Sequence, residues 1–196
     1  MTTKHIGILL FDGMEELDAV GPWEVFAWWT QNFPDDGYAA TTFSFDGRPV
    51  TSAKSLVVQP HHSLDTVPRL DVLLHPGGRG SEPLSEDDGH LDWLRQQREQ
   101  VPLITSVCTG SIVLAAAGLL RDRPATSYHT ALTRLGELDP SIDVRAGERY
   151  VDDGDIITSA GVSAGIDMAL HIVGRLVDAE RADQVRRGIE YEPELV

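Results

Sequence analysis

Two kinds of hydrophobic pattern alternate along this chain. Short, nearly continuous apolar runs bounded by Gly, Pro or Asp are typical of buried strands, and longer segments with apolar residues at helical spacing are typical of helices. Strands are predicted at residues 5–11, 39–45, 50–58, 72–75, 103–107, 125–128, 142–145, 150–151 and 156–158, the last two joined by a hairpin turn at 152–155. Helices are predicted at residues 14–20, from 22 onward, and at 90–100, 112–118, 130–138, 162–176 and 179–191. This alternation predicts an α/β fold with a mostly parallel sheet.

A Gly-Pro pair divides the first helical region. Gly21 and Pro22 are expected to end one helix and start the next, because Pro suits the first position of a helix better than its interior. The second helix carries an apolar surface that includes Trp23, Trp28 and Trp29. We assign these tryptophans to the core first and to a dimer interface second.

Composition and charge narrow the class of protein. The 196 residues are 41% hydrophobic and 24% charged, as in an ordinary globular protein, and one domain spanning residues 1–196 is expected. The net charge of −15 disfavours a nucleic-acid partner, because phosphate binding needs clustered Lys and Arg. No apolar window approaches the ~20 residues of a membrane span, and the run at 6–11 lacks the basic lead-in of a signal peptide. We therefore expect a cytoplasmic protein without a membrane partner.

The residues that usually hold metals and phosphates are not suitably spaced. A single cysteine permits neither an intramolecular disulfide nor a Cys-rich metal site. The adjacent pair His61-His62 is expected to lie in a polar loop, and no other ligand spacing is present. The glycine-rich segment 76–80 lacks the Lys-Ser/Thr ending of a phosphate-binding loop. We predict no metal and no cofactor.

Cys108 lies where a predicted strand meets a predicted helix. The small residues Thr109, Gly110 and Ser111 that follow it allow a sharp turn and a close approach of the backbone to a substrate. A helix N-terminus stabilises an anion, so a depressed pKa and partial thiolate character are expected for Cys108. A lone cysteine is more often an inert small hydrophobic residue. Its position at this turn is what favours a nucleophile.

Three loops converge near Cys108 in the predicted sheet. Ligands of such sheets bind at the carboxyl ends of the strands, where the acidic turn after the first strand, the glycine-rich loop and the Cys108 turn all lie. Backbone N–H groups of Gly78 and Thr109 are candidate donors to developing negative charge. Glu15 and Asp18 are both candidate acid/base groups, since they lie three residues apart on one helical face and spacing does not choose between them.

Four motifs give this chain a resemblance to the ThiJ/PfpI superfamily. They are Ile8-Leu9-Leu10-Phe11 through Glu16-Leu17-Asp18 to Gly21-Pro22, then Pro76-Gly77-Gly78, Val107-Cys108-Thr109-Gly110-Ser111, and Ala160-Gly161-Val162-Ser163-Ala164-Gly165-Ile166-Asp167. The resemblance implies the class I glutamine amidotransferase-like fold, a flavodoxin-like sandwich with helices on both faces of the sheet. It also implies a homodimer.

Leu17-Asp18, together with Thr109 directly after the cysteine, looks most like the isocyanide hydratase branch of that superfamily. This resemblance implies a cofactor-free lyase that adds water to an isocyanide, or a similar small electrophile, to give an N-substituted formamide. Cys108 would be the nucleophile, Asp18 rather than Glu15 the acid/base, and Thr109 would position Asp18 or the intermediate. Gly77, Gly78, Tyr128 and Glu15 would bind the substrate or stabilise its developing charge.

One departure from the superfamily separates the alternatives. Relatives commonly carry a histidine at the position of Tyr128, and His129 lies one residue along, where a strand would point it to the other face. A Cys-His dyad of the glyoxalase-like or protease-like kind is therefore disfavoured, and Tyr128 is expected to shape the pocket or donate a hydrogen bond. The non-enzymatic alternative is a ligand-binding or redox-sensing protein in which Cys108 is oxidised. The same Cys-Thr-Gly turn occurs in sensor-like domains of AraC-type regulators.

Overall fold

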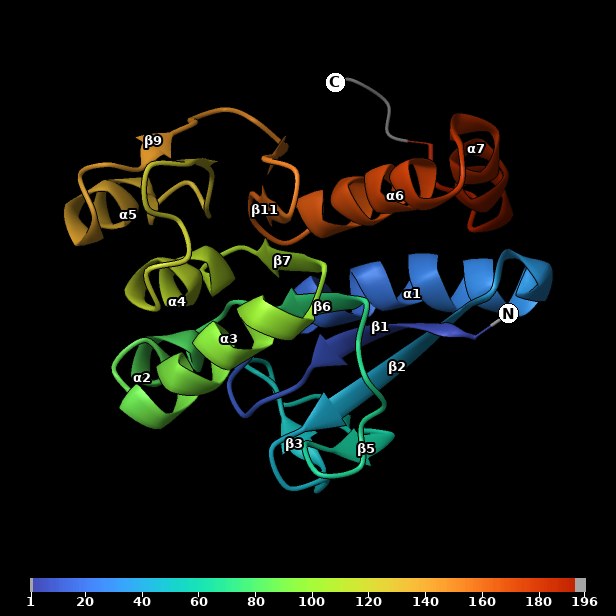
Figure 1. Ribbon diagram of the computed structural model, residues 1–196, viewed down its shortest axis with the longest axis horizontal. Coiled ribbons are helices and arrows are strands. Elements are labelled where there is room, and N and C mark those ends of the chain that lie inside the picture. The colour runs from blue at the N-terminus through green and yellow to red at the C-terminus, as the bar shows by residue number, and fades with distance from the viewer. Residues whose placement is uncertain (1, 193–196) are drawn as a thin grey trace.

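The computed structural model describes residues 2–192 and is built around one large sheet (Figure 1). The sheet has seven strands in the order β10-β11-β7-β6-β1-β2-β5. They are β1 (Lys4–Leu9), β2 (Tyr38–Ser44), β5 (His62–Ser63), β6 (Val72–His75), β7 (Leu103–Val107), β10 (Tyr150–Asp152) and β11 (Ile156–Ser159). All neighbouring pairs are parallel except β10 and β11, which form an antiparallel hairpin. The mostly parallel sheet and the hairpin are confirmed.

Two groups of helices cover the sheet. The first group is α1 (Glu16–Asn32), α6 (Ala164–Leu176) and α7 (Ala179–Gly188), which pack against one another. The second is α2 (Ser81–Leu84), α3 (Asp88–Gln100), α4 (Gly110–Ala116) and α5 (Leu132–Leu138), in which α4 contacts the other three. Figure 1 shows the first group at the right and the second at the left. This arrangement confirms the flavodoxin-like α/β class.

Several short elements complete the chain. A 3₁₀ turn, η1 (Pro34–Asp36), follows α1. Two small sheets pair β3 (Val50–Thr51) with β4 (Val57–Val58) and β8 (Pro124–Ala125) with β9 (Asp143–Val144). The segment 50–58 is thus a short hairpin, and His62, expected in a polar loop, forms part of the edge strand β5. None of the helices within residues 2–192 has the length and apolar character needed to cross a membrane.

The central strands form the core of the molecule. Every residue of β6, β7 and β11 is buried, as expected where helices cover both faces of a parallel sheet. The strands β1, β6, β7 and β11 run in the same direction, so their carboxyl ends lie at one edge. The loops that leave these ends meet there and build the site described below.

The predicted helix break at Gly21 and Pro22 is wrong, because α1 continues through both residues. Pro22 lacks an N–H group and so removes only the helical hydrogen bond that the carbonyl oxygen of Asp18 would accept. Packing offsets this loss. A Cβ at Gly21 would lie 3.0 Å from Cγ1 of Ile166, so glycine allows α1 and α6 to approach closely.

The three tryptophans of α1 pack against other parts of the same chain. Trp29 is fully buried, and its Nε1 donates a 2.7 Å hydrogen bond to Asp36 Oδ2. Trp28 lies under α7, where a Cβ at Gly188 would come 2.0 Å from its Cζ2 atom. Trp23 is partly buried against the core. The assignment to the core is confirmed for Trp29, whereas Trp23 and Trp28 pack against the core and stay partly exposed.

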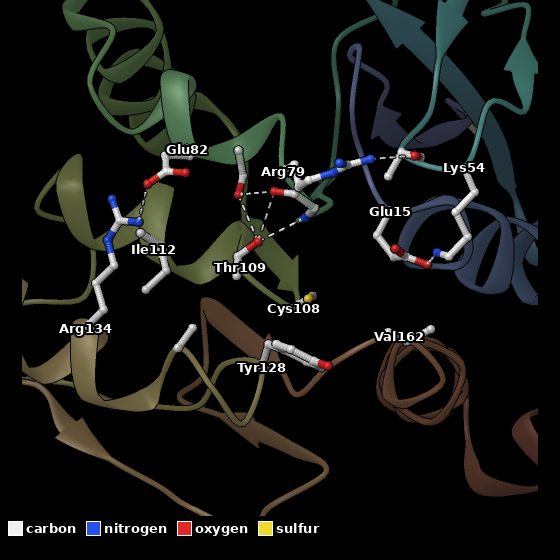
Figure 2. A pocket seen from close by; sticks show the side chains of 14 residues that line it. Glu15, Lys54, Arg79, Glu82, Cys108, Thr109, Ile112, Tyr128, Arg134 and Val162 are labelled. Atoms are coloured by element: carbon white, nitrogen blue, oxygen red, sulfur yellow. Dashed lines mark hydrogen bonds and ion pairs between the residues drawn. The ribbon is translucent and has the colours of Figure 1, made fainter.

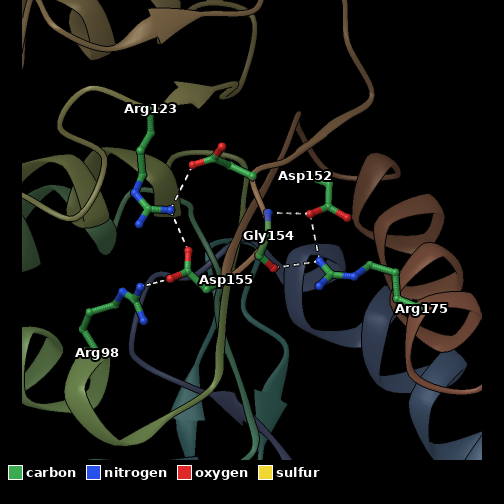
Figure 3. A network of polar contacts seen from close by, with 7 residues as sticks. Arg98, Arg123, Asp152, Gly154, Asp155 and Arg175 are labelled. Carbon is green, nitrogen blue, oxygen red and sulfur yellow. Dashed lines mark hydrogen bonds and ion pairs between the residues drawn. The ribbon is translucent and has the colours of Figure 1, made fainter.

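A network of arginines and aspartates holds the end of the sheet opposite the site (Figure 3). The β10–β11 turn presents Asp152, Asp153 and Asp155, whose carboxylates pair with arginines from three separate segments. Those arginines are Arg98 in α3, Arg123 before β8 and Arg175 in α6. One acidic turn therefore connects helices from both groups.

Candidate active site

Cys108 occupies a sharp turn between β7 and α4. Its φ angle is +59°, a left-handed conformation that is uncommon for a residue with a side chain. Hydrogen bonds hold it there: the Cys108 N–H donates to the carbonyl oxygens of Ser159 and Ala160, both at 3.2 Å, and the Cys108 carbonyl accepts from the hydroxyls of Ser111 and Ser127, both at 3.1 Å. The predicted turn is confirmed, and its strain of about 1–3 kcal/mol is of the kind found at functional sites.

Asp18 lies in the first turn of α1 and is completely inaccessible to solvent. Its Oδ2 atom accepts the N–H of Gly77 at 3.0 Å, whereas Oδ1 has no hydrogen-bond partner among the described residues. Burial raises the pKa of Asp18 to about 7, and the charge of Glu15 adds to the rise. Asp18 is therefore able both to accept and to donate a proton near neutral pH.

The expected depression of the Cys108 pKa is wrong. Burial raises the pKa of the thiol to about 12, and the neighbouring Asp18 carboxylate adds to the rise. The backbone and hydroxyl of Thr109 act in the opposite direction but do not outweigh them. The helix terminus is weak here because α4 spans only residues 110–116 and its first residue lies two places beyond Cys108. The resting nucleophile is a neutral thiol next to a group that can take its proton.

The glycine-rich loop positions these two groups. A Cβ on Gly77 would lie 2.4 Å from the Thr109 nitrogen, and one on Gly78, whose φ is +106°, would lie 2.2 Å from the Glu15 nitrogen. Glycine is therefore needed at both places for three loops to meet. The Gly78 N–H donates to Thr109 Oγ1 at 2.9 Å, and the Glu15 N–H donates to the Gly77 carbonyl at 2.9 Å.

These bonds change the roles expected for the loop. The N–H of Gly77 already binds Asp18 and that of Gly78 already binds Thr109, so neither is a free donor for a reaction intermediate. Thr109 acts on Asp18 indirectly. Its hydroxyl holds the N–H of Gly78, and the N–H of the preceding residue, Gly77, holds the Asp18 carboxylate. Its hydroxyl also bonds Ser81 Oγ at 2.8 Å. The loop is part of the positioning machinery of the site.

Cys108 faces a cavity of about 670 Å³ (Figure 2). Glu15, Gly78, Thr109 and Tyr128 also line it, as the sequence predicted, whereas Asp18 and Gly77 are buried and are not among the lining residues. The remaining lining residues are Ala53, Lys54, Arg79, Ser81, Glu82, Ile112, Ala131, Arg134 and Val162. The cavity is large enough for a small organic substrate beside the thiol.

Most charged groups at the cavity form ion pairs. Lys54 forms an ion pair with Glu15, and Arg134 lies 3.2 Å from Glu82. The guanidinium of Arg79 donates to the Ala53 carbonyl at 2.8 Å. Figure 2 shows these contacts on opposite walls, with the sulfur of Cys108 between them. Lys54 and Arg134 are therefore neutralised by carboxylates, whereas Arg79 is the lining cation, among the described residues, that has a carbonyl partner and no carboxylate.

Tyr128 lies at the cavity, and its neighbour His129 is exposed. The Tyr128 ring packs on Gly161, where a Cβ would lie 2.2 Å from its Cδ2 atom. No Cys-His dyad forms from this segment. The expectation that Tyr128 shapes the pocket is consistent with its position.

Sequence reasoning missed three contributors. Ser81 is buried and bonds Thr109, and Lys54 brings the β3–β4 hairpin to the cavity through Glu15. Val162 has a φ of +54°, and its backbone lowers the pKa of Asp18, counteracting part of the effect of burial. A β-branched residue in this conformation is a genuine outlier. The segment around Val162 was visible as a motif, but no pattern indicated which backbone group would face Asp18.

Residues 4–175 match the sequence profile of the DJ-1/PfpI family. The chain belongs to this family. Within residues 2–192 of this DJ-1/PfpI protein, no three His, Cys, Asp or Glu side chains gather as a metal site. The resemblance predicted from the four motifs is confirmed.

Three relatives place the chain more closely. It is 41% identical over 192 residues to an isonitrile hydratase of Pseudomonas putida. The alignment covers 96% of this chain and 79% of that enzyme. It is 30% identical to the HTH-type transcriptional regulator GbdR of Pseudomonas aeruginosa over 88% of this chain but only 46% of the regulator. The crystal structure of a ThiJ/PfpI family protein from Pseudomonas syringae superposes with a TM-score of 0.87 at 33% identity, covering 99% of this chain and 77% of that one. The DJ-1/PfpI fold thus occurs in both an enzyme and a regulator.

Proposed function

We propose that this protein adds water to isocyanides, or to a similar small electrophile, to give N-substituted formamides. The observation that carries the proposal is the pair formed by Cys108, held at a strained turn, and Asp18, buried with a pKa of about 7. The 41% identity to an isonitrile hydratase over nearly the whole chain supports the same reaction class. Such a reaction needs a nucleophile and a proton carrier, and these roles fall to Cys108, which lines the cavity, and to the buried Asp18 next to it.

The first step forms a covalent adduct. The Asp18 carboxylate takes the proton of the Cys108 thiol as the sulfur attacks the terminal carbon of the isocyanide. Asp18 then returns that proton to the same carbon, and the product is a thioimidate in which carbon is bonded to sulfur and hydrogen and doubly bonded to nitrogen. A neutral resting thiol suits this step, because its proton becomes the formyl hydrogen of the product.

The second step consumes water. Asp18 takes a proton from water as the water oxygen bonds to the thioimidate carbon, and the proton passes to the nitrogen. The tetrahedral adduct then collapses: the carbon–oxygen double bond forms, the carbon–sulfur bond breaks, and the hydroxyl proton returns through Asp18 to the sulfur. One isocyanide and one water give one formamide, and the enzyme is regenerated. Asp18 serves both steps because its pKa lies near neutrality.

The structure favours this proposal over the two alternatives. A glyoxalase-like or protease-like enzyme would use a histidine beside the thiol, and Tyr128 stands at that place. A redox sensor depends on a reactive thiolate, and burial raises the pKa of Cys108 to about 12. These two alternatives therefore lack their reactive group in the resting site, whereas a ligand-binding protein would use the same cavity without turnover and is distinguished by the activity test below.

The test is formamide production from cyclohexyl isocyanide by the wild-type protein, Cys108→Ala and Asp18→Asn. We expect turnover by the wild type, loss with Cys108→Ala and a fall of at least about 100-fold with Asp18→Asn, as general acid–base catalysis contributes. The control is Ser163→Ala, a substitution at a residue that lies outside the cavity. Folded wild-type protein without turnover, or undiminished turnover in either variant, would refute the proposal.

We also propose that the chain forms a homodimer, as the family resemblance implies. Val20 of α1 is 38% exposed and Val57 of the β3–β4 hairpin is 63% exposed, which leaves apolar side chains on the surface of the isolated chain. Light scattering should give twice the chain mass of 21.5 kDa. A monomer mass that does not change with concentration would exclude the dimer.

A further inference from the structure

Two buried histidines lie behind the glycine-rich loop and take no part in the proposed chemistry. His75 ends β6 and is completely buried, and His90 in α3 is 5% exposed. Their Nε2 atoms are 2.9 Å apart. Phe11 packs against His75, and Trp93 stacks on His90, with ring centroids 5.4 Å and 5.3 Å apart. A polar pair enclosed by aromatic rings is costly unless its hydrogen bonds are well used.

The contacts fix where each proton lies. His75 Nδ1 is 2.7 Å from the Pro76 carbonyl oxygen, which only accepts, so this nitrogen carries a proton. Burial lowers the pKa of His75 to about 3 and that of His90 to about 4, so both rings are neutral near pH 7. His75 Nε2 then carries no proton and accepts a hydrogen bond from the Nε2–H group of His90. This leaves His90 Nδ1 bare, and it has no partner among the described residues.

The chain of hydrogen bonds continues into the active site. The Pro76 carbonyl oxygen, which accepts the hydrogen bond from His75 Nδ1, belongs to the same peptide group as the Gly77 N–H. That N–H donates to Asp18 Oδ2 at 3.0 Å. We propose that His90 and His75 are positioning residues for Asp18, acting through the peptide group that joins Pro76 to Gly77. The inference rests on the proposed function, in which Asp18 carries the proton.

The physical effect is twofold. A hydrogen bond to the carbonyl fixes the plane of the peptide and so aims its N–H at the carboxylate. It also polarises the peptide, and such chains strengthen each bond by roughly 10–30%. A stronger N–H donor stabilises the ionised carboxylate, which partly opposes the effect of burial on Asp18. Glu15 and Cys108 are the titratable groups that affect the pKa of Asp18, whereas Asp87 is the charged group that acts on His90, where it opposes the effect of burial.

Matched substitutions separate the donor from the space it fills. His75→Leu removes the Nδ1 donor and keeps an apolar side chain of similar volume, whereas His75→Asn offers an amide N–H near the same place. His90→Leu and His90→Gln make the same comparison at the second ring. Trp93→Phe perturbs the packing around His90 but touches no hydrogen bond of the chain, since Trp93 contacts His90 by stacking.

The decisive measurement is the titration of Asp18 by carbon NMR of the labelled carboxyl group, together with the pH dependence of kcat for isocyanide hydration. We expect His75→Leu to raise the pKa of Asp18 by about half a unit to one unit and to lower kcat at pH 7 by about 3- to 10-fold, with KM nearly unchanged. His75→Asn should restore both values, and Trp93→Phe should leave the pKa of Asp18 unchanged.

The outcomes distinguish this inference from the proposed function. An unchanged Asp18 titration in His75→Leu, or the same shift in His75→Asn as in His75→Leu, would overturn it. If the His75 variants do not fold, the His90→Leu and His90→Gln pair decides by the same criteria. A wild-type protein that does not hydrate isocyanides would refute the proposed function, while the carboxyl titration would still report whether the histidines act on Asp18.

Discussion

The backbone of Gly110 packs directly against the carbonyl oxygen of His75. A Cβ at Gly110 would lie 2.3 Å from that oxygen and 2.8 Å from the carbonyl oxygen of Pro76. The first residue of α4 therefore has to be glycine for the Cys108 turn and the glycine-rich loop to meet.

Gly110→Ala should destabilise the fold and reduce activity together. Because the clash involves backbone atoms, relief requires the turn and the loop to separate, and we expect a loss of about 1–3 kcal/mol in the free energy of unfolding. Urea denaturation measures it. The control is Gly136→Ala in α5, where the new Cβ would make an ordinary 3.5 Å contact with Val144. Equal stability of the Gly110→Ala variant and the wild type would contradict the packing argument.

The difference in stability between Asp18→Asn and the wild type should depend on pH. The pKa of Asp18 is about 7 in the folded protein and 3.8 for an unperturbed carboxyl. The folded chain therefore keeps a proton that the unfolded chain releases, so this group's stabilising contribution is complete below pH 4 and is lost as the pH rises through 7. Asn carries no charge and avoids that loss. Above pH 7 the variant should exceed the wild type by roughly 2–4 kcal/mol, although it is inactive.

Denaturant titrations at pH 4.5, 6 and 8 check this expectation. The difference between Asp18→Asn and the wild type should grow in that order. Ser163→Ala serves as the reference variant, since it lies outside the cavity and its comparison with the wild type should not change with the Asp18 titration. Superimposable curves for Asp18→Asn and the wild type at pH 8 would show that burial of the carboxylate costs no stability.

Cys108 should react slowly with iodoacetamide at pH 7. Burial and Asp18 raise its pKa to about 12, so the thiolate is scarce at neutral pH, and the alkylation rate should keep rising beyond pH 9. Asp18→Asn removes the neighbouring negative charge and should speed alkylation about tenfold at a given pH. Mass spectrometry follows the reaction. A rate that reaches a plateau below pH 7 would indicate a stable thiolate and would favour a redox role.

Tyr128 and His129 should respond differently to substitution. Tyr128→Ala removes one wall of the cavity and should raise KM at least about fivefold, a loss of roughly 1 kcal/mol of substrate binding. Tyr128→Phe keeps the ring and isolates the contribution of the hydroxyl. His129→Ala changes an exposed side chain and should leave kcat and KM unchanged. A greater effect of His129→Ala than of Tyr128→Ala would show that His129, and not Tyr128, lines the cavity.

The central part of the sheet was predictable because strands β6, β7 and β11 are buried throughout. Continuous apolar runs such as 72–75 and 103–107 leave little ambiguity in strand assignment, and loops at their carboxyl ends converge in any parallel sheet. Cys108, Thr109 and Asp18 were therefore found from pattern and resemblance. The continuous α1 was not predicted, because local propensity at Pro22 yields to the close packing of Gly21 on Ile166.

The sequence pattern could not predict the ionisation state of the site residues. A helix N-terminus suggests a thiolate at Cys108, but the pKa depends on burial and on which charge lies beside the sulfur. Likewise, the sequence places His75 and His90 fifteen residues apart, and only the packing of α3 against the sheet brings their rings together. Long-range contacts of this kind have no signature in residue spacing.

The acidic β10–β11 turn divides the molecule into regions with different sensitivity to salt. Its carboxylates hold Arg98, Arg123 and Arg175 at partly exposed positions, where dissolved ions weaken such attractions. The contacts that arrange Asp18, Thr109 and Cys108 are hydrogen bonds donated by buried or partly buried backbone N–H groups, which dissolved ions weaken much less. Added salt should therefore weaken the ion pairs that connect the two helix groups at lower concentrations than those that disturb the reacting groups. Catalysis should then persist at salt concentrations that already lower the stability of the fold.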